Sequence, residues 1–382
     1  MNLPIDSKYI WLMNASTGLV ALNTIFLRQC GVNKNISVWS TVENIYNELY
    51  NDKKNVVICP VHPEKNSFDK ILHLFIYDVF VFFVYRDPIG VLKHALNHIN
   101  NELTWKNIDR SNKFFNMTYN YNNLFPAVYY GYCFNNTIPS VEFIGNCIGA
   151  KPYFTTQKRL NILKKYSKIK NIKCIEFSQI SIENAFNTFT KLAREYGFTC
   201  PNNLIAFQGR ANRNQGDLIY LPVTLYVHSY DLDNINEMDK TSFNLKGGVD
   251  IIITTHQIHL KKEGFVDITQ EIFDDRKLMF DNIVLLVKSN EYKILKDNQD
   301  LFIASKKYLN NYMDALEKHE QKIKDNLITE EQILDYLKNN KDLRVRLKNI
   351  LDEDLTYVKQ NHPEYLQQWE YYQEFEKMCE ND

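Results

Sequence analysis

The side chains best suited to chemistry follow three separate apolar runs of the sequence, each of strand length. In chain order they are Ser16-Thr17-Gly18, His62 and Arg86. Hydroxyl groups, open backbone N–H groups and the donor fork of an arginine all bind phosphate or similar anions. A histidine can accept the proton of a hydroxyl group near neutral pH. These residue types therefore indicate a site that holds an anionic donor and activates a hydroxyl.

Ser16, Thr17 and Gly18 precede a helix that the apolar spacing predicts over residues 19–29. The N–H groups and the dipole at a helix start favour an anion, and the two hydroxyls can add hydrogen bonds. The alternative is that Ser16 or Thr17 only caps the helix.

Arg86 stands between an apolar run and a helix start that Pro88 marks. It can clamp a phosphate, or it can pair with Asp87 or another carboxylate at the edge of the sheet, and the sequence leaves both open. His94 lies about two turns inside that helix and could face the same ligand, although a core or surface histidine is the commoner case.

His62 lies in a loop stiffened by Pro60 and Pro63. A lone histidine is more often structural than catalytic. The carboxyl ends of parallel strands meet at one edge of a sheet, so the three loops point to one crevice. This convergence favours His62 as a general base.

The elements that must position these residues alternate between strand and helix. Strands are predicted at residues 9–13, 56–59, 79–85, 173–177, 218–226, 249–253 and 283–287. Helices are predicted at residues 19–29, 42–50, 69–77, 89–99, 155–167 and 182–196. The early strands are apolar without alternation, which indicates burial on both faces. We expect an α/β fold with a mostly parallel sheet covered by helices, P-loop-like in its opening unit.

The predicted domain organisation has two parts. Residues 1–300 form the α/β domain that binds the donor, with 100–152 as a lid or insertion because that stretch is rich in Asn and lacks a clear period. Residues 301–382 form a helical region with 12 basic and 17 acidic residues. A solvated helical cap is the favoured interpretation of this acidic region.

Composition excludes several classes of protein. The 382 residues include 45 basic and 46 acidic side chains, a balance that argues against a protein that coats nucleic acid. Seven scattered cysteines without a C-x-x-C pair argue against a disulfide scaffold or zinc ribbon and favour reduced thiols in the cytoplasm. The longest apolar run, 71–85, is shorter than a membrane span. No G-x-x-x-x-G-K-[ST] motif or metal-ligand cluster is present, so a nucleotide hydrolase is disfavoured and no metal is expected.

The order strand, Ser-Thr-Gly loop, helix, histidine loop, apolar strand and Arg-x-Pro helix start resembles the nucleotide-dependent sulfotransferase fold. The resemblance implies a P-loop-like turn at residues 14–18 for the 5′-phosphosulfate of 3′-phosphoadenosine 5′-phosphosulfate. It also implies that His62 is the base and that Arg86 binds the 3′-phosphate. Residues 176–197 are similar to a later strand and helix of that family.

The similarity to sulfotransferases extends to Arg210 but has two departures. Residues 207–217, which include Arg210, are similar to the family's basic, glycine-containing 3′-phosphate loop. The 14–18 turn lacks the lysine that the family carries there, and His94 stands where the family has a serine.

A second resemblance rests on residues 86–89 and on the tail 362–376, which contains the letters WEYYQEFE. Both segments are similar to a bacterial domain family of unassigned function, found in host-associated bacteria, whose members have been labelled sugar transferases. The tail motif is specific for the family rather than for a reaction.

A basic stretch at residues 158–173 could meet an anionic glycan or the membrane surface, although a solvated helix face is the favoured interpretation. Its members are Lys158, Arg159, Lys164, Lys165, Lys168, Lys170 and Lys173.

We therefore expect a cytoplasmic group transferase that uses a nucleotide-activated donor to modify a hydroxyl of a cell-surface saccharide or its precursor. His62 would deprotonate the acceptor, and the transferred group could be sulfuryl, a phosphoryl-type substituent or a sugar. The expected donor-binding residues are Ser16, Thr17, Gly18, Arg86, His94 and Arg210. The alternative, which the missing lysine favours, is a catalytically inactive nucleotide-binding or interaction scaffold with the same fold.

Overall fold

The structure is a computed structural model. It describes residues 9–12, 14–18, 21–32, 34–36, 56–58, 78–100, 103–104, 113–121, 124–149, 153–166, 168–208, 218–234, 245–256, 258–259 and 263–380.

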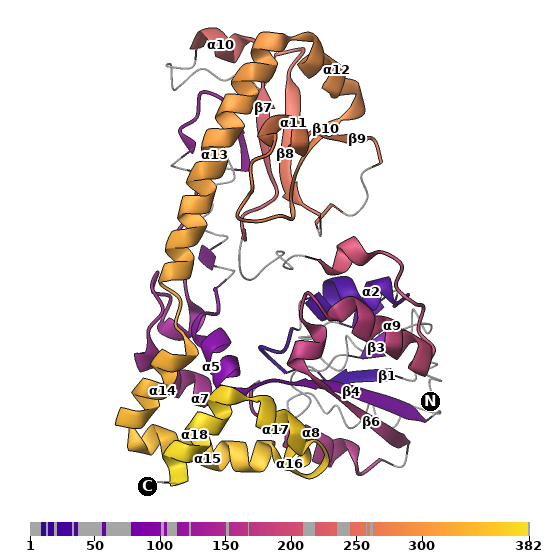
Figure 1. Cartoon of the computed structure of the whole chain (residues 1–382), viewed down its shortest axis with the longest axis vertical. Helices are drawn as coiled ribbons and strands as arrows, with labels where there is room; N and C mark the ends of the chain where they lie inside the picture. Colours follow the sequence, from indigo (N-terminus) through magenta and orange to yellow (C-terminus); the bar gives the residue numbers. More distant parts are fainter. Residues whose placement is uncertain are drawn as a thin grey trace. The chain divides into compact units, whose positions relative to one another are not determined.

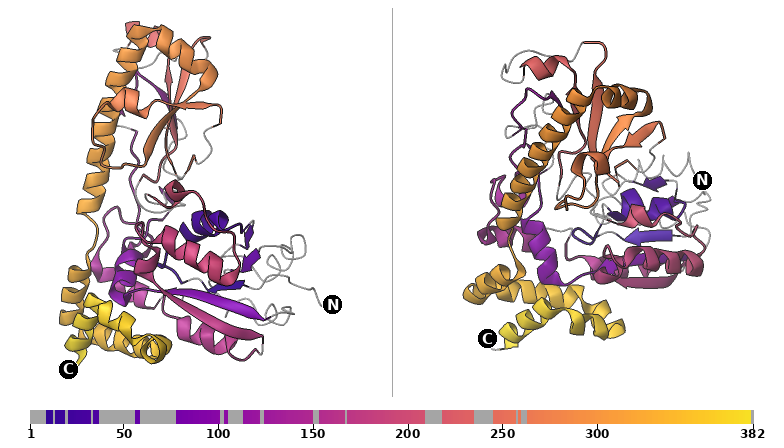
Figure 2. Two further views of the ribbon diagram at one scale, coloured as in Figure 1. Left: turned by 45° about the vertical axis from the view of Figure 1, so that its right-hand side comes forward. Right: turned by 45° about the horizontal axis from the view of Figure 1, so that its top comes forward.

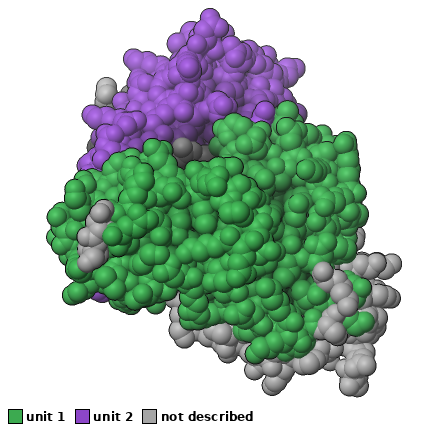
Figure 3. Space-filling view, turned by 60° about the horizontal axis from the view of Figure 1, so that its bottom comes forward, with its two compact units in different colours: residues 1–97, 139–207, 328–382 green, residues 98–138, 208–327 purple. Residues whose placement is uncertain are grey.

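The chain forms two compact units that interleave along the sequence (Figure 3). Unit 1 comprises residues 1–97, 139–207 and 328–382, and unit 2 comprises residues 98–138 and 208–327. The chain therefore passes between the units four times.

Unit 1 is built on a parallel sheet of five strands in the order β2-β3-β1-β4-β6 (Figure 1). The strands are β1 (Tyr9–Leu12), β2 (Lys34–Ile36), β3 (Val56–Ile58), β4 (Val79–Tyr85) and β6 (Ile169–Glu176). All but one of the seven residues of β4 are buried, which confirms the double-sided burial expected from its unbroken apolar run.

Helices cover both faces of this sheet (Figure 1, Figure 2). Successive residues of a strand point to opposite faces. Phe82 accordingly packs on Tyr196 of α9 (Ala185–Tyr196), whereas Phe83 packs on Tyr357 of α16 (Thr356–Asn361).

The remaining helical segments of unit 1 include short turns beside full α-helices. They are η1 (Leu22–Phe26), α2 (Leu27–Gln29), α5 (Pro88–Leu96), η5 (Val141–Phe143), α7 (Ile144–Ile148), α8 (Thr156–Leu163), η6 (Phe177–Ile180), η7 (Leu204–Phe207), α14 (Glu330–Asn339), α15 (Lys341–Asp354), α17 (Pro363–Gln368) and α18 (Glu370–Glu380).

Unit 2 has its own five-stranded sheet in the order β5-β7-β8-β10-β9. Its strands are β5 (Phe114–Asn116), β7 (Val223–Val227), β8 (Val249–Thr255), β9 (Phe265–Asp267) and β10 (Ile283–Lys288). Only β5 and β7 pair in parallel, and the other pairs are antiparallel. The helical segments are η4 (Gly131–Cys133), α10 (Tyr230–Asn234), α11 (Thr269–Phe273), α12 (Ser289–Asp297) and α13 (Gln299–Asp325).

The expected α/β class with helix-covered, parallel-containing sheets is confirmed, but its organisation differs in two respects. The strands at 223–227, 249–255 and 283–288 form a separate sheet that is largely antiparallel rather than extending the parallel one. The compact units also do not divide at residue 300. Helix α13 belongs to unit 2, where Tyr312 stacks on Phe115, while residues 328–382 belong to unit 1. Of the expected insertion at 100–152, residues 100–138 are part of unit 2 and residues 139–152 are part of unit 1.

None of the helices in the described parts of the chain is both long enough and apolar enough to cross a membrane.

Candidate functional site

The parallel sheet places two polar loops side by side at its carboxyl edge. Strand β1 is followed along the chain by β2 on one side of it, whereas its neighbour β4 is followed by β6 on the other side. The connections that leave β1 and β4 therefore diverge, and such a switch point is where open α/β sheets bind ligands. The 14–18 turn leaves β1 at this point, and Arg86 leaves β4.

The 14–18 turn is tight and locally braced. The hydroxyl of Thr17 donates to the carbonyl of Asn14 at 2.7 Å, and the carbonyl of Gly18 accepts from the N–H of Leu22 at 3.0 Å. Ser16 and Gly18 both have positive φ, at 68° and 78°. Glycine suits position 18 for a second reason, because a Cβ there would lie 3.1 Å from Ile180 Cδ1.

The turn carries open hydrogen-bond donors. Ser16 is only 8% exposed, and its Oγ has no partner among the residues that the structure describes. The backbone N–H groups of Ser16, Thr17 and Gly18 also donate to no acceptor in the described parts of the chain. Successive N–H groups around residues of alternating backbone conformation form concave sites for anions. The turn therefore has hydrogen-bond donors without a partner among the described residues, and its expected role in binding an anion stays a prediction.

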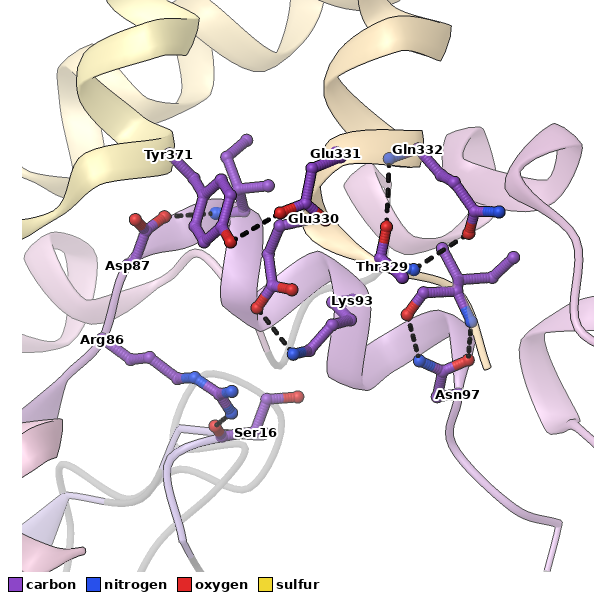
Figure 4. A network of polar contacts seen from close by, with 12 residues as sticks. Ser16, Arg86, Asp87, Lys93, Asn97, Thr329, Glu330, Glu331, Gln332 and Tyr371 are labelled. Atoms are coloured by element: carbon purple, nitrogen blue, oxygen red, sulfur yellow. Dashed lines mark hydrogen bonds and ion pairs between the residues drawn. The ribbon is translucent and has the colours of Figure 1, made fainter. Parts of the chain in front are cut away.

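Arg86 is held against this turn by the ends of three strands. Its Nη1 donates to the carbonyl of Ser16 at 3.0 Å, as Figure 4 shows. Its guanidinium lies 4.3 Å from the ring centre of Phe177, the residue that follows β6. A Cβ on Gly90 would lie 3.2 Å from Arg86 Nε, so the glycine gives the guanidinium room beside α5.

Burial lowers the pKa of Arg86, while the nearby charges of Glu330, Asp87 and Glu176 oppose that shift. An arginine remains charged under such conditions. No carboxylate in the described parts of the chain forms an ion pair with Arg86, so the direct salt bridge that the sequence left open is not formed there. One Arg86 donor is used by the Ser16 carbonyl, and the other donors of the guanidinium have no hydrogen-bond acceptor among the residues that the structure describes.

The carboxylates next to Arg86 are engaged elsewhere. Asp87 caps α5, accepting from the N–H of Ile89 at 2.8 Å, and its second oxygen accepts from the N–H of Tyr372 at 3.2 Å. Burial raises the pKa of Asp87, and these N–H groups oppose the shift. Glu176 accepts from the indole N–H of Trp369 at 3.0 Å. These contacts fix the carboxylates in place and keep them off the guanidinium.

The exposed side of α5 binds the start of α14. Lys93 pairs with Glu330 at 2.6 Å, and the Asn97 side chain bonds both the N–H and the carbonyl of Ile328 (Figure 4). His94 lies one turn beyond Gly90 on the same face of α5 and is half-buried. Among the described residues, Arg86 contacts Ser16 and Phe177 but not His94, so a shared ligand for Arg86 and His94 stays a prediction.

The structure thus places Arg86 against the turn that contains Ser16, Thr17 and Gly18, and their role in binding a donor stays a prediction. His62 and Arg210 lie outside the described residues, so their place at this edge stays a prediction. Sequence reasoning missed Phe177 and Gly90. The usable signals were an aromatic residue directly after a buried strand and a glycine in the first turn of a helix that follows an arginine.

No group of three or more His, Cys, Asp or Glu suited to a metal ion occurs among the residues that the structure describes. The model of the protein family of unknown function DUF2972 matches residues 174–381, more than half of the chain. No curated protein matches the chain.

Proposed function

Because the chain belongs to DUF2972, a family without an assigned function, we propose its activity from its own geometry: a group transferase that uses a nucleotide-activated donor. The single observation that carries the proposal is the 3.0 Å hydrogen bond from Arg86 to the Ser16 carbonyl. It joins the loops of two neighbouring strands at the switch point of a parallel sheet. This place and these donors suit the phosphates of a nucleotide.

The proposed chemistry is displacement at the activated group of the donor. The acceptor hydroxyl attacks that group, the bond to the nucleotide phosphate breaks, and the phosphate leaves with the bonding electrons. The open N–H groups of the 14–18 turn and the charge of Arg86 would stabilise the negative charge on the leaving phosphate. The acceptor proton would pass to His62, the predicted base. General base catalysis of this kind would increase the reaction rate about 10²–10⁴-fold.

The sulfotransferase-like fold and the saccharide acceptor belong to this proposal. The sulfotransferase-like fold is supported by the order of elements at one edge of the sheet. A parallel strand is followed by a polar turn and a helix, and a neighbouring strand is followed by an Arg-x-Pro helix start. A cytoplasmic location is part of the proposal, and its support is the scattered cysteines of the sequence, which lack a C-x-x-C pair.

The test is a thermal-shift and calorimetric panel of nucleotides. It compares 3′-phosphoadenosine compounds with CDP-, UDP- and GDP-linked donors. Stabilisation by adenosine 3′,5′-bisphosphate alone supports sulfuryl transfer, whereas stabilisation by a cytidine, uridine or guanosine compound supports transfer of another group. No stabilisation by any nucleotide would reject the proposal.

A variant pair ties binding to the site. Arg86→Lys keeps the charge but loses the forked donors and the flat contact with Phe177, and we expect about tenfold weaker nucleotide binding. Arg194→Lys, on the exposed side of α9, is the matched control and should bind as the unaltered chain does. Equal affinities for the two variants would remove Arg86 from the site.

The variant His62→Ala distinguishes a transferase from the alternative, an inactive scaffold with the same fold. In a transferase this variant keeps donor binding and loses turnover. In a scaffold it changes neither donor binding nor any cellular phenotype.

A further inference from the structure

Asn14 anchors the open turn to helix α8. The side-chain oxygen of Asn14 accepts from Arg159 Nη1 at 3.0 Å, and its amide nitrogen donates to the hydroxyl of Thr156 at 2.5 Å. The Asn14 carbonyl accepts from Thr17 Oγ1 at 2.7 Å. One residue therefore joins α8 to the hydrogen bond that closes the turn.

Arg159 is one of the most deeply buried side chains of unit 1, with 2% of its surface exposed. Its burial corrects the expectation that it belongs to a solvated basic face. Residues 156, 159, 160 and 163 repeat at helical spacing and form the buried face of α8, while Lys158 points to solvent. A charged group this far from water is costly unless it is paired, so its partners are informative.

The start of α8 is in turn fixed by the C-terminal helices. Asp354, the last residue of α15, accepts from the N–H of Gln157 at 3.1 Å, and the Gln157 side chain accepts from the N–H of Tyr357 at 3.0 Å. A carboxylate at a helix start is favoured by the open N–H groups and the dipole. Asp354 also lies near enough to Arg159 to interact with its charge.

We propose that Arg159 is a positioning residue for the anion-receiving turn, acting through Asn14. With the Asn14 side chain held on α8, the bond from Thr17 to the Asn14 carbonyl keeps the turn in the conformation in which the Ser16 hydroxyl has no partner among the described residues. The buried charge of Arg159 contacts Asn14 at the start of the turn and favours an anion there. The inference rests on the proposed function and adds that helix α8 supports the donor site through the contact of Arg159 with Asn14.

The test is a double-mutant cycle on affinity for inorganic pyrophosphate and adenosine 3′,5′-bisphosphate. Asn14→Ala and Arg159→Met should each weaken binding about tenfold, and the double variant should bind no more weakly than the weaker single one. Both remove the same link, so their effects should not add.

A structural role alone predicts a different pattern. Gln157→Ala, on the same helix, removes contacts to α16 but not to Asn14, so it should lower the melting temperature and leave affinity unchanged. Arg159→Lys keeps the charge and should recover part of the affinity. If Arg159→Met does not fold, Asn14→Ala and Arg159→Lys still carry the test through affinity and through amide exchange at residues 15–18.

The outcomes separate the two proposals. If the unaltered chain binds neither probe, the proposed function fails and this inference fails with it. Two other results overturn only the positioning role of Arg159. In one, the unaltered chain binds the probes and Asn14→Ala and Arg159→Lys bind them as tightly as it does. In the other, the effects of Asn14→Ala and Arg159→Met add in the double variant.

Discussion

Asp354 is a carboxyl group buried to 95% within the helical region, and burial raises its pKa from 3.8 to about 6. The folded protein therefore holds this proton more tightly than the unfolded chain does. The resulting contribution to stability is fully present below pH 3.8 and is lost as the pH rises through 6. At neutral pH the ionised form depends on the N–H groups at the start of α8 and on Arg159.

Asp354→Asn should remove that pH dependence because the amide does not ionise yet keeps an oxygen to accept from Gln157. Relative to the unaltered chain, the variant should gain up to about 3 kcal/mol between pH 4 and pH 7, which is the free energy that corresponds to the rise of the Asp354 pKa from 3.8 to about 6. Urea midpoints at several pH values measure this difference.

Asp352 provides a control of opposite sign on the same helix. Lys348 and Lys359 lower its pKa, so its contribution is present above pH 3.8 and is lost only at lower pH. Asp352→Asn should therefore leave the slope between pH 4 and pH 7 unchanged. If the urea midpoints of Asp354→Asn and of the unaltered chain change with pH in the same way, the proposed effect of the Asp354 pKa on stability is wrong.

The sequence predicted Arg86 and the 14–18 turn because a charged or hydroxyl residue directly after an apolar run is a local pattern. It did not predict Phe177 or Asn14 as partners, since these contacts join residues far apart in the chain. Arg159 was misplaced for the same reason. It lies in the sequence between two exposed lysines, Lys158 and Lys164, whereas its partners in space are Asn14 and Asp354.

Helix α5 passes close to Arg86, and Gly90 makes that approach possible. Alanine at this position would favour the helix by up to about 1 kcal/mol but would place a Cβ 3.2 Å from Arg86 Nε. We expect Gly90→Ala to weaken nucleotide binding severalfold with little change in the melting temperature. Calorimetric titration and thermal unfolding measure the two effects.

Gly145→Ala in α7 is the matched control for Gly90→Ala. Its added Cβ would lie 3.6 Å from Leu343 Cδ2, an ordinary contact, so it should leave affinity unchanged. Equal binding by both glycine variants would show that the guanidinium does not need the space at α5.

Strands within an apolar run were predictable, whereas strands without one were not. The run 79–85 predicted β4 with its bounds, and a short apolar run predicted β3, but β2, β5 and β9 have three residues each and lie outside any apolar run that predicted a strand. The partition of strands between two sheets was also not predictable. Pairing is a long-range property, and apolar runs such as 283–287 are equally compatible with a parallel or an antiparallel neighbour.

The interleaved units predict that the C-terminal helices cannot be removed as a separate domain. Residues 328–382 bury Leu347, Leu351, Val358, Trp369 and Phe375 in unit 1. Burial of each such side chain contributes roughly 1.5–3 kcal/mol. Their sum is comparable with the total stability of about 5–15 kcal/mol that is typical of a folded protein.

A chain that ends at Leu327 should therefore lose amide-exchange protection in β4 of unit 1 and keep it in β8 of unit 2, as hydrogen exchange with mass spectrometry can measure. Retained protection in β4 would mean that the parallel sheet is stable without the helices that cover it.

The four passages of the chain between its units also impose an order on biosynthesis. On the ribosome, β4 and α5 emerge long before α14, α16 and α18. Phe83 can pack on Tyr357 only after more than 200 further residues have been translated. The nascent sheet has one uncovered apolar side throughout that interval and is a natural client for chaperones. A polypeptide released early would be degraded rather than persist as a partly folded protein.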